Sequence, residues 1–210
     1  MGSNDELYDA IVFGERDRVV EIVQQQVDAG ADVGEILNVT MIPALREVGD
    51  QFSRGEVFVP EMLVSARAMQ AGVDIIEPLL VSSGHKPIAR VCIGSVKGDL
   101  HDIGKNLVTM MLDGGGFEAI DLVIDLAPSA FVDAVREHKP DVVGMSALLT
   151  TTMIQMKATV DALEEAGLRD SVKIMIGGAP VTADFAKQIG ADAYAPDAAT
   201  AVELARELTA

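Results

Sequence analysis

The chain has 210 residues, of which 49% are hydrophobic, and this suffices for one large or two small domains with a buried core. Its formal net charge of −17 is spread over both halves, which argues against a nucleic-acid partner whose phosphates require cationic contacts. The single cysteine, Cys92, excludes an internal disulfide, and no apolar run approaches the roughly 18 residues of a membrane span. Because the polar start Asn4–Glu6 is unlike a secretory signal, we expect a cytoplasmic protein with no membrane partner.

Residues 1–83 have the periodicity of helices only. Pro43 should kink a helix or mark its start, and Pro60 opens another helix at a position where a missing N–H costs nothing. Helices are predicted at 5–13, 16–29 and 33–52 and from Pro60 onward, with capping pairs Ser3/Glu6 and Asp32/Glu35. We therefore expect a four-helix bundle, joined by the polar linker 82–87 to a second domain over 88–210.

The second half alternates short apolar runs with helical stretches, a pattern typical of a parallel sheet covered on both faces. Five such units favour a flavodoxin-like (Rossmann-like) doubly wound α/β domain with a five-stranded sheet. The predicted strands are 88–93, 118–124, 141–146, 172–176 and 191–194, and the predicted helices are 104–112, 130–138, 153–166, 182–189 and 198–208.

The loops after the first, third and fourth strands should hold the ligand, because open α/β sheets bind ligands beyond the carboxyl ends of their strands. The first of these loops carries His101 between Asp99 and Asp102. Imidazole is a common metal ligand, but a surface histidine with acidic neighbours is equally ordinary. His85 and His138 lie in the linker and at a helix end, so neither is a site candidate.

The other two loops are rich in small and hydroxyl residues. Ser146 to Thr152 holds one serine and three threonines, with Thr151 or Thr152 placed to cap the following helix. Gly177-Gly178 permits either a close approach to a ligand or a tight turn. Neither loop identifies a ligand by itself.

The three loops together resemble the signature of cobalamin-binding domains. The pattern is Asp99-x-His101-x-x-Gly104, then Ser146-x-Leu148 after 41 residues, then Gly177-Gly178 after 28 more. The segment 55–69 is similar to the helical cap of methionine synthase and of the corrinoid proteins of methyltransferase systems, so the resemblance covers nearly the whole chain.

The resemblance implies a cobamide bound base-off, with its nucleotide tail in a slot of the α/β domain and His101 as cobalt ligand. Asp99 would fix the tautomer of that histidine, and Ser146 would extend the network. Gly104, Gly177 and Gly178 would leave room for the tail. Further candidates for cofactor contact are Asp102, Ile103, Leu148, Thr150, Thr151 and Thr152 and, at the fifth strand end, Tyr194 and Asp197.

The same resemblance implies that the helical domain covers the face of the cofactor that carries the methyl group. Phe58, Val59, Met62 and Met69 are the candidates, although residues at such spacing also suit a bundle core. The implied function is a methyl carrier of anaerobic one-carbon metabolism. Its implied partners are a substrate-specific methyltransferase, an acceptor methyltransferase and a reductive activase. The chain would then be a subunit and not a complete enzyme.

Three other functions are open to such a sequence. A cobamide-dependent regulator would need a DNA-binding element, and the acidic chain has no basic recognition helix. The small subunit of an adenosylcobamide mutase usually lacks a cap with the Phe58-Val59-Pro60 segment. A receiver or flavodoxin domain would need acids at the first strand end or aromatics beside a flavin, whereas the first strand here ends in Gly94-Ser95.

Overall fold

The computed structural model describes residues 2–210, which divide into two compact units. The helical unit runs to Pro87 and includes Met110–Gly116, and the α/β unit consists of Ile88–Thr109 and Phe117–Ala210. The domain limits of 1–83 and 88–210 stay a prediction. Within residues 2–210, no helix combines the length and the apolar character that crossing a membrane requires.

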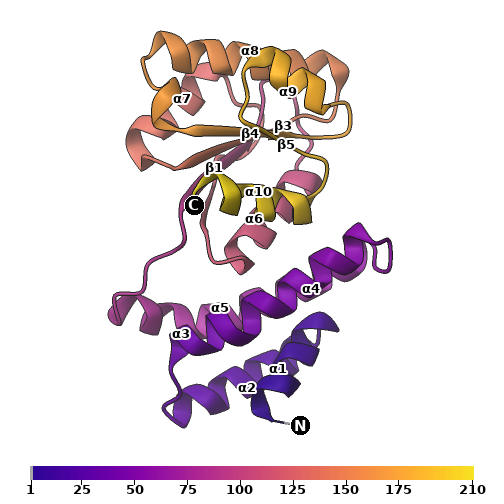
Figure 1. Cartoon of the computed structure of the whole chain (residues 1–210), viewed down its shortest axis with the longest axis vertical. Helices are drawn as coiled ribbons and strands as arrows, with labels where there is room; N and C mark the ends of the chain where they lie inside the picture. The colour runs from indigo at the N-terminus through magenta and orange to yellow at the C-terminus, as the bar shows by residue number, and fades with distance from the viewer. Residues whose placement is uncertain (1) are drawn as a thin grey trace. The chain divides into compact units, whose positions relative to one another are not determined.

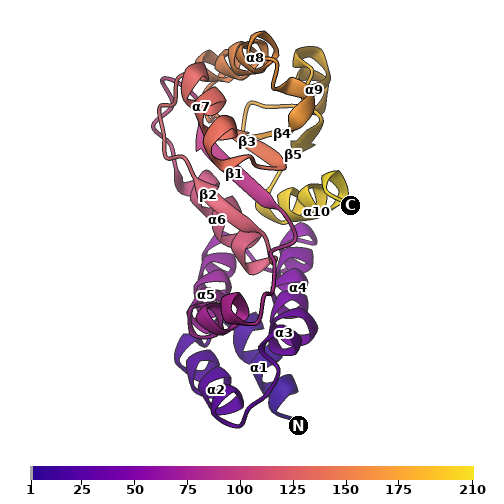
Figure 2. The same cartoon turned by 90° about the vertical axis from the view of Figure 1, so that its left-hand side faces the viewer.

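The helical unit packs α5 along α2, and α1 contacts α2, α4 and α5 (Figures 1 and 2). Fully buried side chains that include Leu7, Ile11, Leu45 and Ile76 form its core. Its elements are α1 (Ser3–Val12), α2 (Arg16–Asp28), α3 (Val33–Glu35), the π-helical segment η1 (Ile36–Met41), α4 (Ile42–Ser53) and α5 (Val59–Ser82).

Of three predicted helix starts in this unit, those at Asp32 and Pro43 are confirmed and the capping pair at Ser3 is wrong. The Asp32 carboxylate accepts the backbone N–H groups of Gly34 and Glu35 and caps α3, as predicted. Pro43 lies in the first turn of α4, directly after the π-helical segment, so it marks a helix start inside a continuous helical stretch. The first capping pair is wrong, because α1 begins at Ser3 with Gly2 as its N-cap residue, and Asp5 accepts from the backbone of Gly2.

The α/β unit is built on five parallel strands in the order β2-β1-β3-β4-β5 within the described residues. This order confirms the flavodoxin-like prediction and places the switch in strand order between β1 and β3. The strands are β1 (Arg90–Ser95), β2 (Glu118–Asp121), β3 (Val142–Ser146), β4 (Lys173–Gly177) and β5 (Ala193–Ala195).

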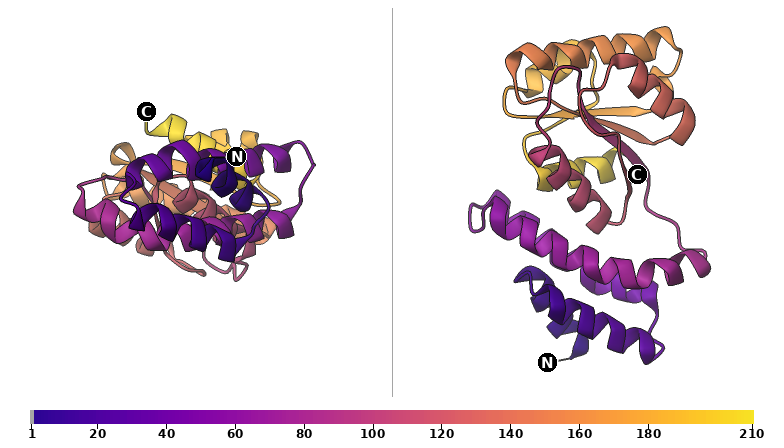
Figure 3. Two further views of the ribbon diagram at one scale, coloured as in Figure 1. Left: turned by 90° about the horizontal axis from the view of Figure 1, so that it is seen from below. Right: turned by 180° about the vertical axis from the view of Figure 1, so that it is seen from behind.

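Helices cover both faces of this sheet. Figures 1 and 2 show α7, α8 and α9 on one face and α10 with the start of α6 on the other, and the view from behind agrees (Figure 3). A core that includes Phe131, Met156, Leu163 and Ile174 lies beneath the first group. The helices are α6 (Ile103–Gly114), α7 (Pro128–His138), α8 (Thr150–Glu165), the 3-10 turn η2 (Arg169–Ser171), α9 (Ala183–Ile189) and α10 (Ala198–Leu208).

The second strand is shorter than predicted. The apolar run 118–124 predicts a strand throughout, but β2 ends at Asp121. Val123 and Asp125 adopt left-handed backbone conformations, with φ of 69° and 56°, which no strand residue can have. A β-branched valine favours a strand and rarely takes positive φ. The residue type at position 123 therefore predicts a strand, whereas the loop requires a left-handed backbone there.

Cys92 lies in β1 and is fully buried, and this burial raises the pKa of its thiol to about 11. We expect iodoacetamide at about pH 8 to leave native Cys92 unmodified, because the reactive thiolate is scarce and inaccessible. In denaturant the pKa returns toward its usual value and alkylation should go to completion, as measured by intact mass. Equal alkylation rates in the two states would contradict the buried placement of β1.

Candidate functional site

The loops singled out in the sequence start side by side at the carboxyl edge of the sheet. Ser95 at the end of β1 is in register with Ser146 at the end of β3, and Ser146 is in register with Gly177 at the end of β4. The backbone N–H of Val96 also donates to the carbonyl of Ser146 at 3.1 Å. The structure therefore brings the three parts of the motif together at the switch in strand order.

His101 is oriented by a carboxylate. Its Nδ1 lies 2.8 Å from Oδ1 of Asp99, and its backbone N–H donates to the same oxygen at 3.1 Å. The Asp99 side chain is fully buried, whereas half of the His101 side chain is exposed. Because an ionised carboxylate only accepts, Nδ1 carries a proton, so in the neutral tautomer Nε2 is the nitrogen that can bind a metal.

The second oxygen of Asp99 ties this loop to the start of α8. Oδ2 accepts the Thr152 hydroxyl at 2.6 Å and the backbone N–H of Leu148 at 2.7 Å. Burial opposes the ionisation of Asp99, but the hydrogen bonds from Thr152, Leu148 and His101 outweigh it and hold the pKa well below its usual range. Asp99 is therefore a charged group with both oxygens in use.

The hydroxyl that bonds Asp99 is that of Thr152, and the predicted role of Ser146 in this network stays a prediction. Among the hydrogen bonds of residues 2–210, none joins the Ser146 hydroxyl to Asp99, and the hydroxyl in that position belongs to Thr152. Thr152 also does not cap α8, because the helix starts at Thr150 with Leu149 as its N-cap residue and without a side-chain capping bond. Of the three consecutive threonines, helical geometry turns only Thr152 inward, and Thr150 and Thr151 are exposed.

The glycines of the motif differ in what surrounds them. A Cβ on Gly178, where φ is 128°, would lie 1.9 Å from the Ala147 carbonyl oxygen, and one on Gly177 would lie 2.8 Å from that of Ala195. Packing between strand ends therefore requires both glycines, whether or not a ligand passes them. A Cβ on Gly104 would meet nothing within 4 Å, so open space lies beside the start of α6.

Four exposed aliphatic side chains accompany His101, and we call them the apolar rim. Two of them, Leu100 and Ile103, lie on the His101 loop and the start of α6, and they are 66% and 71% exposed. The others, Leu148 and Leu149, directly precede α8 and are 44% exposed each. Aliphatic side chains at a strand-end edge suit a large, mostly apolar ligand. The sequence prediction included Ile103 and Leu148 but missed Leu100 and Leu149, whose only signal is an apolar residue inside a polar loop.

The weaker candidates already have structural partners. The Asp102 carboxylate accepts from the Asn106 side chain at 3.2 Å. Asp197 caps α10 by accepting the backbone N–H of Thr200 at 2.8 Å. Tyr194 is partly buried against the core of the sheet. Contact of these residues with a cofactor remains a prediction.

In the helical unit, two of the four candidate covering residues are core residues. Met62 and Met69 are fully buried in α5 and have no exposed surface with which to cover a ligand, so the bundle-core alternative holds for them. Phe58, the N-cap residue of α5, is 66% exposed, and Val59 in its first turn is 38% exposed. These two are the candidates that the structure leaves available.

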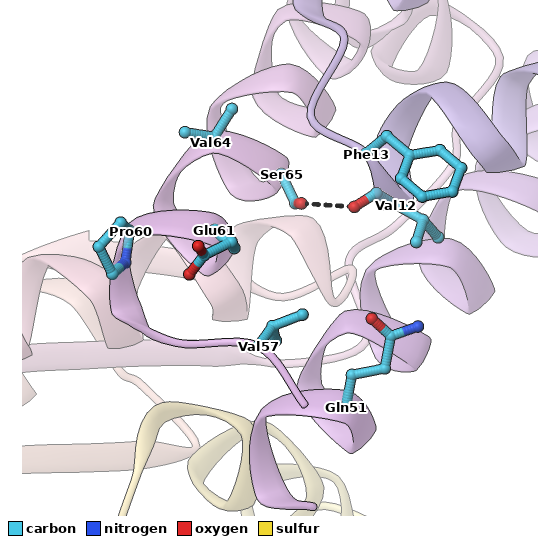
Figure 4. A pocket seen from close by; sticks show the side chains of 8 residues that line it. All are labelled: Val12, Phe13, Gln51, Val57, Pro60, Glu61, Val64 and Ser65. Carbon is cyan, nitrogen blue, oxygen red and sulfur yellow. Dashed lines mark hydrogen bonds between the residues drawn. The ribbon is translucent and has the colours of Figure 1, made fainter. Parts of the chain in front are cut away.

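A pocket of about 390 Å³ lies beside the start of α5 (Figure 4). The Ser65 hydroxyl bridges its wall by donating to the carbonyl of Val12 at 3.0 Å. The pocket is lined by Val12, Phe13, Gln51, Val57, Pro60, Glu61, Val64 and Ser65. The predicted covering residues Phe58 and Val59 thus lie next to a largely apolar pocket that is lined by residues of the helical unit.

Comparison with known families matches both halves of the chain. Residues 89–205 match the family described as B12 binding domain, and residues 4–77 match a second family with the same description. The chain belongs to the corrinoid proteins of methyltransferase systems. This corrinoid protein therefore binds a cobamide, as the strand-end motif indicated.

Curated relatives of this corrinoid protein match it over most of its length. A corrinoid protein of Desulfitobacterium hafniense is 39% identical over 97% of this chain and 96% of its own length. Trimethylamine corrinoid protein 2 of Methanosarcina mazei is 44% identical over 87% of this chain and 84% of its own.

Solved structures agree with the sequence relatives. A cobalamin-binding protein from Desulfitobacterium hafniense matches 99% of this chain and 98% of its own, with a TM-score of 0.83 and 31% identity. The methanol:cobalamin methyltransferase complex MtaBC from Methanosarcina barkeri matches 99% of this chain and 79% of its own, with a TM-score of 0.86 and 32% identity.

The residues of this corrinoid protein fit a cobamide. Nε2 of His101 makes no hydrogen bond within residues 2–210 and belongs to a half-exposed ring, so it is available to bind a metal. The open space beside Gly104 and the apolar rim provide room and apolar surface on the same edge of the sheet.

Thr152→Val should destabilise the cofactor-free protein by about 1–3 kcal/mol, because it removes one of the two donors to the buried, charged Oδ2 of Asp99 while preserving side-chain volume. A urea titration followed by circular dichroism measures this change. Thr151→Val, next to it on the exposed face, is the matched control and should stay within about 0.5 kcal/mol of wild type. If the two variants unfold at the same urea concentration, Thr152 does not hold Asp99.

Proposed function

We propose that this corrinoid protein binds its cobamide base-off with His101 as the lower axial ligand. Bound in this way, it would shuttle a methyl group between a substrate methyltransferase and an acceptor methyltransferase. The cobamide supplies the cobalt centre that accepts and releases the methyl group. The chain's own residues would ligate, orient and shield that centre.

The observation that carries the proposal is the buried, ionised Asp99 bonded to Nδ1 of His101. A carboxylate on one ring nitrogen fixes the tautomer and raises the basicity of the other, as in many metal sites. Thr152 and Leu148 occupy the second oxygen, so Asp99 cannot turn away from the imidazole without losing two further hydrogen bonds. His101 is therefore oriented in the absence of a metal, which supports its proposed role as a ligand.

Asp99 would also stabilise a positive charge on the imidazole, because its carboxylate lies beside Nδ1 of His101. The exposed half of the His101 ring would give a proton at Nε2 a route to solvent.

The remaining residues would shape and protect the site. We assign the open space at Gly104 and the strand ends at Gly177 and Gly178 to the nucleotide tail. Phe58 and Val59 would cover the reactive face, because exposed apolar side chains exclude the water that consumes reactive nucleophiles.

The proposed partners are inferred from the relatives. Its curated relatives include trimethylamine and dimethylamine corrinoid proteins, and a solved match is a methanol:cobalamin methyltransferase complex. We propose a substrate methyltransferase of this kind, an acceptor methyltransferase and a reductive activase as its partners. A lid of exposed apolar residues would need to open for each of them in turn.

His101→Ala should abolish axial ligation by the protein. Wild type reconstituted with a cobamide is expected to give a base-off, histidine-ligated absorption spectrum, and the variant should give a spectrum without an axial nitrogen from the protein. His138→Ala, at the end of α7, is the matched control and should match wild type. Equal spectra for wild type and His101→Ala would remove His101 as the ligand.

The transfer itself is tested with the reduced holoprotein and methanol- or methylamine-specific methyltransferases. Wild type should consume labelled substrate and carry the label, whereas His101→Ala should carry less. Failure with every enzyme that methylates a known corrinoid protein in parallel would contradict the assignment to these substrates.

A further inference from the structure

Lys105 is a buried cation close to the proposed ligand. Its side chain is only 1% exposed, although it lies in the first turns of α6, four residues after His101. Its Nζ donates to the Asp121 carboxylate and to the side-chain oxygen of Asn106, both at 2.6 Å. A charge is rarely buried without a partner, so this pair firmly connects the start of α6 to the end of β2.

The Asp121 carboxylate also fixes the loop that follows β2. The oxygen that accepts from Lys105 accepts the backbone N–H of Val123 at 2.8 Å. Val123 and Asp125 both have left-handed backbone conformations. Residues other than glycine adopt this conformation only where their surroundings enforce it. Lys105 therefore holds the acceptor on which the strained loop Leu122–Leu126 depends.

This loop is bonded to the segment Ser95–Asp99, which leads into His101. Val123 accepts the backbone N–H of Ser95 at 3.1 Å, and the Ser95 hydroxyl donates to the backbone carbonyl of His101 at 2.8 Å. Asp125 accepts the backbone N–H of Gly98 at 2.7 Å and donates its own N–H to the carbonyl of Asp99 at 3.1 Å. The backbone that carries the imidazole is thus anchored from outside the Asp99 network.

We propose that Lys105, Asp121 and Asp125 are positioning residues that hold His101 at the height and angle needed for axial ligation, acting through the loop Leu122–Leu126. The inference rests on the proposed ligation by His101. The hydrogen bonds of these three side chains go to Asn106, Val123, Gly98 and one another, and not to the His101 ring or to the ends of β3 and β4. Their loss should therefore release His101 from the metal more than it weakens retention of the cobamide.

The test uses Lys105→Met and Asp125→Ala, each reconstituted with cobamide and reduced to the Co(II) state. Electron paramagnetic resonance measures the fraction of cobalt that has an axial nitrogen, and equilibrium titration measures cobamide binding. We expect the ratio of ligated to unligated His101 to fall about tenfold in both variants, as for other outer-shell partners of metal ligands. Most of the cobamide should remain bound.

Two controls separate positioning from folding. Asp125→Asn retains an oxygen acceptor for Gly98 and tolerates positive φ, so it should restore the wild-type ratio. Lys157→Met removes an exposed ion pair with Asp161 on α8 and should change nothing. Asp125 is linked to Lys105 only through the loop. The comparison of Asp125→Ala with Asp125→Asn therefore still tests the inference if Lys105→Met does not fold.

The outcomes are distinct for the two levels of the proposal. Full axial ligation in all bound cobamide of Lys105→Met and Asp125→Ala would overturn the inference, even if both variants were less stable. Wild-type protein without a histidine nitrogen on cobalt would overturn the proposed function itself, whatever the variants show.

Discussion

Asp99 is a fully buried carboxylate that accepts four hydrogen bonds, and two loops of the α/β unit depend on it. One oxygen holds the side chain and backbone of His101, and the other holds Leu148 and Thr152 at the start of α8. Because an unsatisfied buried charge is far more costly than a missing neutral hydrogen bond, the loops after β1 and β3 can have only the conformations that supply these donors. The orientation of the imidazole follows from that requirement.

The sheet makes this arrangement possible. Parallel strands place their carboxyl ends at one edge, and the order β2-β1-β3-β4-β5 puts the ends of β1, β3 and β4 next to one another. The apolar rim and the open space at Gly104 lie on the same edge. A ligand with a large apolar body and a long polar tail can therefore meet a nitrogen ligand, apolar side chains and open space at this edge.

Much of the fold was predictable because its signals are local and periodic. Alternation of strands and helices gave the parallel sheet and its order, and Asp32, Pro43 and Pro60 marked helix starts by their backbone chemistry. The prediction for the end of β2 was wrong because long-range contacts, and not local signals, determine where this strand ends. Val123 is locally a strand former, and long-range bonds to Asp121 and Ser95 override that preference.

The site was predictable in outline but not in its finer contacts. The spacing of Asp99, His101 and Gly104 is a local feature, whereas the donor to Asp99 is selected by which threonine of α8 turns inward. Ser146 and Thr152 are equivalent as hydroxyls in a sequence, and only the helix start at Thr150 separates them. The burial of Met62 and Met69 was not predictable for a similar reason, because residues of a bundle core and residues that cover a ligand have the same helical spacing.

The most direct measurement is electron paramagnetic resonance of the Co(II) cobamide holoprotein, prepared with histidine labelled with ¹⁵N and an unlabelled cofactor. A nitrogen from His101 on cobalt should change the axial splitting from the three lines of ¹⁴N to the two lines of ¹⁵N, and the change should vanish in His101→Ala. A splitting that keeps three lines would show that the cofactor's own base occupies the axial position, and it would contradict ligation by His101.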